Sequence, residues 1–165
     1  MKPALLVIDI QKSFLDINPT AKSSIEDAIW LVNAAIELFR KKDLPVVCIQ
    51  HMNEAHELVP GKDGFEIPDG LAIQDSDLRI HKTYGNSFNK TPLEQELRKQ
   101  GVDTVIVTGF SAEYCVLATY HGARDLDLMP IMLKGSLASG NLEHIKFVEG
   151  ICEIMTFGVL SKMLE

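Results

Sequence analysis

The chain has 165 residues, of which 46% are hydrophobic and 24% charged, and its formal net charge is −7. These are the values of an ordinary globular protein, and the length suits one domain with a sizeable core, so we expect a single domain over residues 1–165. Nucleic acid and anionic membranes bind basic patches, which this acidic sequence does not show. We therefore expect neither as a partner.

The apolar run at the start of the sequence is shorter than a signal peptide or a membrane span requires. This run ends at Asp9, well before the length of a signal-peptide core or a membrane span, so we expect a cytoplasmic protein. Of the three cysteines, Cys48 and Cys152 lie in or beside apolar runs and are expected in the core. No pair has the short spacing of a zinc or redox motif.

Strand-like and helical patterns alternate along the chain. Ser23 and Glu26 form a predicted capping box. The apolar residues that follow recur at helical spacing, and this pattern breaks near Pro45. Thr91 and Pro92 mark another helix start, and that helix is expected to end near Gly101. Strands are expected near residues 4–8, 45–50, 78–81, 104–108, 129–133 and 152–156. Such alternation predicts an α/β fold with three layers (α/β/α), in which helices cover both faces of a mostly parallel six-stranded sheet.

Three residues at predicted element boundaries could carry chemistry, and each also has a plain structural interpretation. Asp9 closes the first strand, where it is either a cap for the next turn or a proton-transfer group. Lys82 follows the third strand, where most lysines are solvated surface charges. Cys115 lies between the fourth strand and a helical pattern, so it is either a reactive thiolate favoured by the helix N-terminus or a buried core residue.

Taken together, the segments around these residues resemble the isochorismatase-like cysteine hydrolase superfamily, which includes nicotinamidase and N-carbamoylsarcosine amidohydrolase. The resemblance rests on three motifs, which occur in the order typical of the family over about 110 residues of the chain. They comprise Asp9, Gln11 and Phe14; then Lys82, Asn86, Ser87 and Phe88; then Val107, Thr108, Gly109, Cys115, Val116, Ala118 and Thr119.

The resemblance implies a catalytic triad of Asp9, Lys82 and Cys115. In this mechanism Asp9 accepts the thiol proton, Lys82 lowers the pKa of the thiol, and Cys115 attacks an electrophilic carbon to form a covalent intermediate. The backbone N–H groups of Ser111 and Cys115 would form the oxyanion hole, with a cis peptide bond at Phe110–Ser111. The resemblance also implies six parallel strands, with strands 1 and 4 adjacent, and a homo-oligomer, either a dimer or a tetramer.

The sequence offers several candidate residues for the substrate pocket, each with a structural alternative. Phe14, Phe88 and Phe110, with Phe65, are expected as apolar walls, although any one of them could be plain core. Tyr114 and Glu113 flank the nucleophile and could set substrate choice, or Glu113 could be a stabilising charge at a helix N-terminus. The long segment 52–77 either covers the pocket, contacts another subunit or is a solvated connection.

No cofactor or metal is expected. Nicotinamidases bind a metal through an acid and histidines after the second strand, but Asn53 and Ala55 stand there in this chain, and the spacing of His51 and His56 is not that of a helical ligand pair. We expect a cysteine hydrolase that cleaves a C–N bond of a small amide, ureide or carbamoyl compound. The alternatives are a catalytically silent metabolite binder, a thiol redox sensor, and a nicotinamidase or isochorismate hydrolase.

Overall fold

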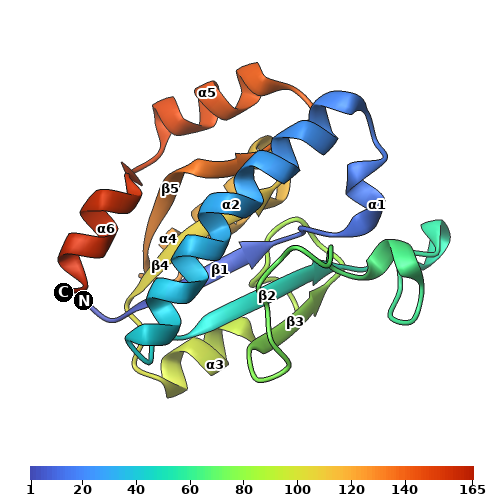
Figure 1. Ribbon diagram of the computed structural model, residues 1–165. Coiled ribbons are helices and arrows are strands. Elements are labelled where there is room, and N and C mark those ends of the chain that lie inside the picture. Colours follow the sequence, from blue (N-terminus) through green and yellow to red (C-terminus); the bar gives the residue numbers. More distant parts are fainter.

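The computed structural model describes all 165 residues and is built around one sheet of six parallel strands (Figure 1). The strand order is β3-β2-β1-β4-β5-β6. The predicted α/β fold is confirmed, and so is the adjacency of the first and fourth strands. The strands are β1 (Pro3–Ile8), β2 (Val46–His51), β3 (Leu78–Lys82), β4 (Thr104–Phe110), β5 (Met129–Ala138) and β6 (Ile154–Met155).

Helices cover both faces of this sheet, each face with its own apolar core. The long helix α2 packs with α6 on one face, and α3 and α4 pack on the other. No helix is both long enough and apolar enough to cross a membrane. The helices are α1 (Lys12–Leu15), α2 (Pro19–Lys41), α3 (Leu93–Lys99), α4 (Leu117–Asp125), α5 (Leu142–Ile151) and α6 (Phe157–Met163), with 3₁₀ turns at Glu54–His56 and Asp63–Phe65.

The central strands are buried from end to end, as parallel strands covered on both faces must be. Successive side chains of β1 alternate between the two cores: Leu6 and Ile8 join the core beneath α3 and α4, whereas Leu5 and Val7 join the core beneath α2. Cys48, on β2, is buried as predicted. The apolar runs that identified these strands thus reflect burial on two sides.

Two helix starts differ from the sequence analysis. Helix α2 begins at Pro19, where the Asn18 side chain accepts a hydrogen bond of 2.7 Å from the N–H of Ala21. Ser23 therefore lies inside the helix, and its predicted capping box is wrong because Asn18 followed by proline already supplies the cap. Pro92 stands at the cap of α3 instead of the first helical position.

Gly109 allows β1 and β4 to approach closely at the edge where both strands end. It pairs with Ile8 and has a φ of +114°. A Cβ atom at this position would lie 2.1 Å from the carbonyl oxygen of Ile8. Only glycine fits, so the residue sets the distance between the strand that leads to Asp9 and the strand that leads to Cys115.

Candidate active site

A buried ion pair between Asp9 and Lys82 forms the centre of the site. Asp9 follows β1 with a φ of +51°, and Lys82 is the last residue of β3, one position earlier than the loop in which it was expected. Nζ of Lys82 lies 3.0 Å from Oδ2 of Asp9, and both side chains are at most 2% exposed. Because the strands are parallel, their carboxyl ends share one edge of the sheet, which is where open α/β sheets place ligands.

Cys115 meets this pair from the other side. It lies in a π-helical turn, Ala112–Val116, that joins β4 to α4. Its sulfur, an oxygen of Asp9 and a nitrogen of His51 all lie within 4.8 Å of one another. The structure therefore brings together the three residues proposed as a triad. Cys115 is half-buried, neither a core cysteine nor fully open to solvent.

Opposing effects act on the thiol of Cys115. Burial and the negative charge of Asp9 raise the pKa of the Cys115 thiol to about 12. Lys82 lowers this pKa, as expected, but the other two effects outweigh it. The raised pKa favours a protonated thiol at rest, and the reactive thiolate offered by the sequence stays a prediction.

Asp9 is suited to receive the thiol proton. Burial raises the pKa of its carboxyl group, and the positive charge of Lys82 opposes that rise. A carboxylate with a raised pKa is a stronger base than an ordinary one. The pair is thus arranged for transfer of the proton from sulfur to Asp9 during attack.

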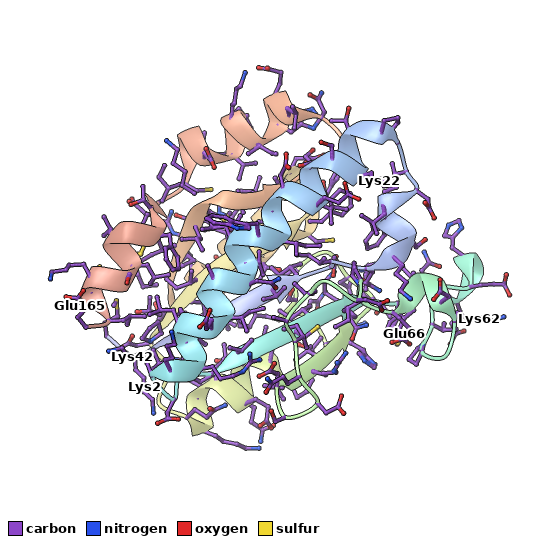
Figure 2. All side chains as sticks on the ribbon, viewed as in Figure 1. Lys2, Lys22, Lys42, Lys62, Glu66 and Glu165 are labelled. Carbon is purple, nitrogen blue, oxygen red and sulfur yellow. The ribbon has the colours of Figure 1, made fainter.

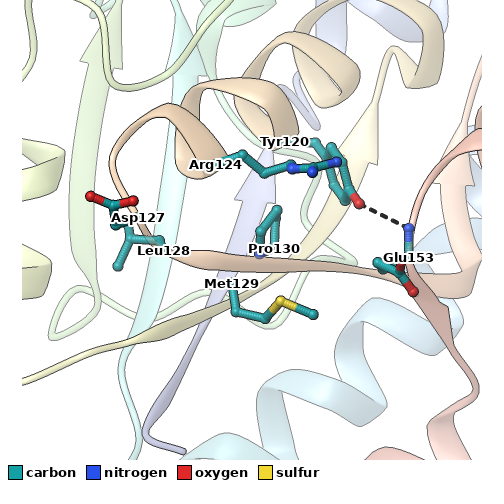
Figure 3. Close-up of a pocket in the computed structure, with 7 residues that line it drawn as sticks. All are labelled: Tyr120, Arg124, Asp127, Leu128, Met129, Pro130 and Glu153. Carbon is teal, nitrogen blue, oxygen red and sulfur yellow. Dashed lines mark hydrogen bonds between the residues drawn. The ribbon is translucent and has the colours of Figure 1, made fainter.

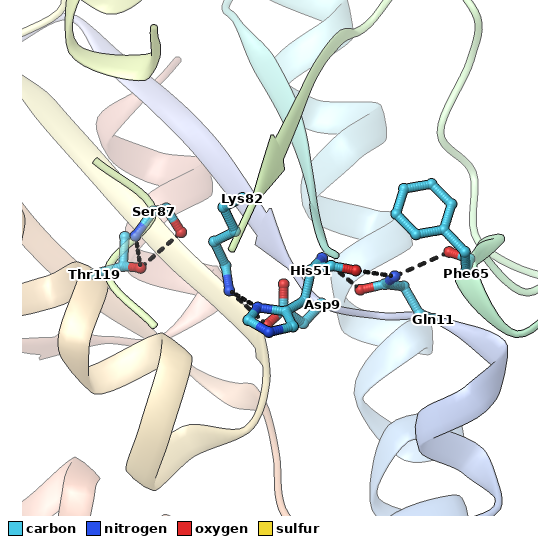
Figure 4. A network of polar contacts seen from close by, with 7 residues as sticks. All are labelled: Asp9, Gln11, His51, Phe65, Lys82, Ser87 and Thr119. Carbon is cyan, nitrogen blue, oxygen red and sulfur yellow. Dashed lines mark hydrogen bonds and ion pairs between the residues drawn. The ribbon is translucent and has the colours of Figure 1, made fainter. Parts of the chain in front are cut away.

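His51 is a member of the site that sequence reasoning missed. Its Nδ1 lies 2.9 Å from Nζ of Lys82 (Figure 4). The side chain of the buried Gln11 holds the backbone of His51 through two hydrogen bonds, one to its N–H at 2.8 Å and one to its carbonyl at 3.0 Å. The sequence identifies His51 only as a possible metal ligand, although its place at the end of β2, beside the end of β1, is a signal for the site.

Gln11 also ties the long segment after β2 to the site. Its amide donates a hydrogen bond of 3.0 Å to the carbonyl of Phe65, and the amide of Gln50 donates another to the same oxygen. Phe65 is buried as a result. Part of segment 52–77 is therefore fixed against the strand ends, and Asn53, His56 and Leu58 from this segment line a surface hollow there.

The turn before Cys115 has the expected shape. The peptide bond between Phe110 and Ser111 is cis. The N–H groups of Tyr114 and Val116 both donate to the carbonyl of Ser111, at 3.0 and 3.2 Å. Ser111 itself is buried. The assignment of the Ser111 and Cys115 N–H groups to an oxyanion hole remains a prediction.

Glu113 anchors this turn to the end of β5. The hydroxyl of Ser139 donates to its carboxylate at 2.8 Å, and Nδ1 of His144 lies 3.1 Å from it. Burial raises the pKa of Glu113, but hydrogen bonds from its own N–H, His144, Ser111 and Ser139 lower it further, so the net shift is downward. A charged Glu113 thus holds the segment that carries Cys115.

The remaining motif residues fasten the loop after β3 to helix α4. The hydroxyls of Ser87 and Thr119 lie 2.7 Å apart, and the Ser87 N–H donates to Thr119 at 3.0 Å (Figure 4). Asn86 packs over Gly122, where a Cβ atom would lie 2.3 Å from its side-chain oxygen. These contacts fix the position of Lys82 relative to the helix that follows Cys115.

Two hollows flank the site. The first has a volume of about 430 Å³ and includes Phe14 and His51 in its lining; the second, of about 390 Å³, includes Tyr114 and His121. Phe14 thus lies in the wall of the first hollow, and Tyr114 is 69% exposed beside the second. Their contact with a substrate stays a prediction.

Phe88 and Phe110 line neither hollow. Phe88 is packed in the core beneath α3 and α4, and Phe110 is packed in the core beneath α2, where its ring stacks on Phe14 at 5.3 Å. Their predicted role as pocket walls is wrong, because β4 and the loop after β3 direct both rings into the apolar layers.

Another pocket, of about 450 Å³, lies away from this edge of the sheet (Figure 3). Tyr120, Arg124 and Glu153 line it, together with the first residues of β5. Since β4 and β5 are parallel, the start of β5 is at the opposite edge from Cys115. This pocket has no part in the chemistry of the triad.

The donor set at the site does not fit a metal ion in this arrangement. Asp9, His51 and Cys115 could each offer one ligand atom. However, the ammonium group of Lys82 already lies 3.0 Å from Asp9 and 2.9 Å from His51. A divalent cation at the same place would face that positive charge directly, and the repulsion would oppose its binding.

Comparisons with known proteins agree with this geometry. The chain matches the Isochorismatase domain over residues 3–148. It is 30% identical over 140 residues to the isochorismatase family protein YrdC of Bacillus subtilis, covering 84% of this chain and 74% of that protein.

Two solved structures have the same fold. An isochorismatase-like hydrolase from Alkaliphilus metalliredigens matches with a TM-score of 0.88 and 26% identity, covering 100% of both chains. N-carbamoylsarcosine amidase from Thermoplasma acidophilum matches with a TM-score of 0.80 and 25% identity, covering 94% of this chain and 95% of that one. With the family match spanning most of the sequence, this chain belongs to the isochorismatase family of hydrolases.

Proposed function

We propose that this chain is a cysteine-dependent amidohydrolase that cleaves a C–N bond of a small amide, ureide or carbamoyl compound. The observation that carries the proposal is the convergence of a thiol, a carboxylate and an ammonium group at one edge of the sheet, from β4, β1 and β3. A protein that only binds a metabolite has no need of these three groups together. The likeness to N-carbamoylsarcosine amidase supports C–N bond cleavage.

In the proposed mechanism, the proton of the Cys115 thiol moves to Asp9 as the sulfur attacks the carbonyl carbon. The oxyanion that forms accepts hydrogen bonds from the N–H groups of Ser111 and Cys115. Asp9 then gives the proton to the departing nitrogen, the C–N bond breaks, and the acyl group remains on sulfur as a thioester or thiocarbamate. Asp9 next takes a proton from water as the water oxygen attacks the acyl carbon. The C–S bond breaks, the acid is released, and Asp9 returns the proton to the sulfur of Cys115.

Lys82 stabilises the charges that this sequence creates. Its ammonium lowers the pKa of Cys115 and opposes the rise that burial causes in the pKa of Asp9, so it favours the charged form of both groups.

The test is a panel of small amides, ureides and carbamoyl compounds assayed for ammonia or amine release. Cys115→Ala and Asp9→Asn should each remove nearly all turnover, and Cys152→Ala, which changes a cysteine outside the site, should leave it intact. Turnover that persists in Cys115→Ala would show that the nucleophile is water or another residue.

A further inference from the structure

The hollow of about 430 Å³ is connected to the triad through one side chain, that of His51. Its Nδ1 contacts Lys82 at 2.9 Å, and the same residue lines the hollow. Gln11 fixes its backbone on both sides, so the ring has a defined place between the ion pair and the hollow. A ring nitrogen of His51 also lies within 4.8 Å of the Cys115 sulfur, so a substrate that extends from Cys115 into the hollow would lie beside this imidazole.

The contact with Lys82 decides the tautomer of His51. A lysine ammonium has three donors and no acceptor, so the nitrogen that faces it at 2.9 Å is the one without a proton. The proton of the neutral ring is then on Nε2, which becomes a hydrogen-bond donor. Burial and the charge of Lys82 both lower the pKa of His51, so the ring stays neutral at neutral pH.

The rest of the hollow offers apolar contact and uncharged polar groups. Phe14, Ile17 and Leu58 supply the apolar surface. Ser13, Asn53 and His56 supply a hydroxyl, an amide and a second imidazole. No lysine, arginine, aspartate or glutamate lines it. The nearby cations are engaged elsewhere, since Lys82 pairs with Asp9.

We propose that this hollow selects uncharged substrates, and that Nε2–H of His51 donates a hydrogen bond to an acceptor on their amide or ureide group. The proposal rests on the proposed function, because it takes Cys115 as the nucleophile. A carboxylate in the hollow would meet no lysine or arginine along its lining, in a protein whose net charge of −7 also repels anions. Primary or secondary amides with an aliphatic or aromatic group are therefore favoured over amides that carry an acid.

A pair of alkylating reagents tests the charge preference without relying on turnover. N-benzyl iodoacetamide and its 4-carboxybenzyl analogue carry the same electrophile and differ in the charge of the tail. The rate of Cys115 labelling is followed by mass spectrometry at pH 8.5. The uncharged reagent should label Cys115 at least about tenfold more efficiently; equal or faster labelling by the carboxylate overturns the proposal.

His51→Asn tests the donor. The asparagine oxygen can replace Nδ1 as the acceptor for Lys82, but the variant has no group at the position of Nε2. The concentration for half-maximal labelling by the uncharged reagent should rise about threefold to tenfold, the effect of one neutral hydrogen bond. His121→Asn, in the other hollow, is the matched control and should leave this concentration unchanged. An effect of His121→Asn without one of His51→Asn overturns the proposal.

Ile17→Arg keeps the proposal testable if His51→Asn does not fold. Ile17 is 55% exposed, so the substitution leaves the core intact and adds a cation to the hollow. It should speed labelling by the carboxylate reagent about fivefold or more relative to Ile17→Gln. If Ile17→Arg leaves the preference for the uncharged reagent unchanged, the hollow is not where the tail of the reagent binds, and the proposal is contradicted. Labelling of Cys48 or Cys152 in place of Cys115 would overturn the proposed function itself, whereas labelling of Cys115 with the wrong preference overturns only this inference.

Discussion

Lys82 and Asp9 form an ion pair of 3.0 Å that is almost completely removed from solvent. Taking two charges out of water is costly, and their attraction offsets that cost only while both partners are present. The pair is therefore a point of vulnerability in the fold as well as the centre of the site.

Lys82→Met should destabilise the protein by about 3–5 kcal/mol at pH 8, because Asp9 is left as an unpaired buried carboxylate. The double variant Asp9→Asn/Lys82→Met should lose less free energy of unfolding than the two single variants lose in sum. Urea unfolding followed by circular dichroism measures all three values. Additive losses would show that the two groups do not interact.

The loss in Lys82→Met should also depend on pH. Burial raises the pKa of Asp9 in the folded state, and removal of Lys82 takes away the main effect that lowers it. A raised folded-state pKa gives stability at low pH that is lost as the pH rises through that pKa. Lys82→Met should thus be closer in stability to the parent protein at pH 5 than at pH 8, and a constant difference would contradict this account.

Labelling of Cys115 by iodoacetamide should speed up nearly tenfold for each pH unit between 7 and 9. With a thiol pKa of about 12, the thiolate fraction is small across this range and grows in proportion to hydroxide. Lys82→Met should slow the labelling further. A labelling rate that reaches a plateau below pH 8 would show that Cys115 is already a thiolate in the resting protein.

Gly109→Ala should destabilise the fold by about 3 kcal/mol or more, because its Cβ would meet the carbonyl oxygen of Ile8 and its φ is positive. Gly150→Ala is the control: no atom lies within 4 Å of the added Cβ in α5, so it should be neutral or stabilise by up to about 1 kcal/mol. Thermal unfolding compares the two. Equal effects would contradict the close approach of β1 and β4.

The expectation of a homo-oligomer stays a prediction. Phe147 on α5 is 62% exposed, and Ile151, Val159 and Met163 nearby in sequence are about half exposed, more apolar surface than a solvated helix needs. Sedimentation velocity at micromolar concentration should show a dimer or tetramer. Phe147→Glu should shift the equilibrium between this oligomer and the monomer toward the monomer. A parent protein that is already monomeric at that concentration would contradict the expectation.

The strands could be predicted because each depends on a local pattern, whereas the grouping of Asp9, Lys82 and Cys115 as a triad came from the resemblance to the superfamily. Apolar runs such as residues 104–108 mark buried strands, and a polar residue directly after such a run, as at Asp9, lies at the ligand-binding edge. The start of α2 was missed because Ser23 and Glu26 have the spacing of a capping box although Asn18 provides the cap.

The pKa of Cys115 and the role of His51 could not be predicted in the same way. Burial of the thiol depends on segments far apart in sequence, and only the folded chain shows that burial outweighs the charge of Lys82. Likewise, His51 and Lys82 are 31 residues apart and meet only because β2 and β3 pair in parallel register.

The central claim is that Cys115 carries the acyl group during hydrolysis. Rapid quenching of the parent protein with a turned-over amide, followed by mass spectrometry of the Cys115 peptide, should reveal the added mass of the acyl group. Asp9→Asn should accumulate less of it, because the thiol then lacks its proton acceptor. Hydrolysis at the parent rate by Cys115→Ala, with no acyl mass on Cys115 in the parent protein, would contradict the account.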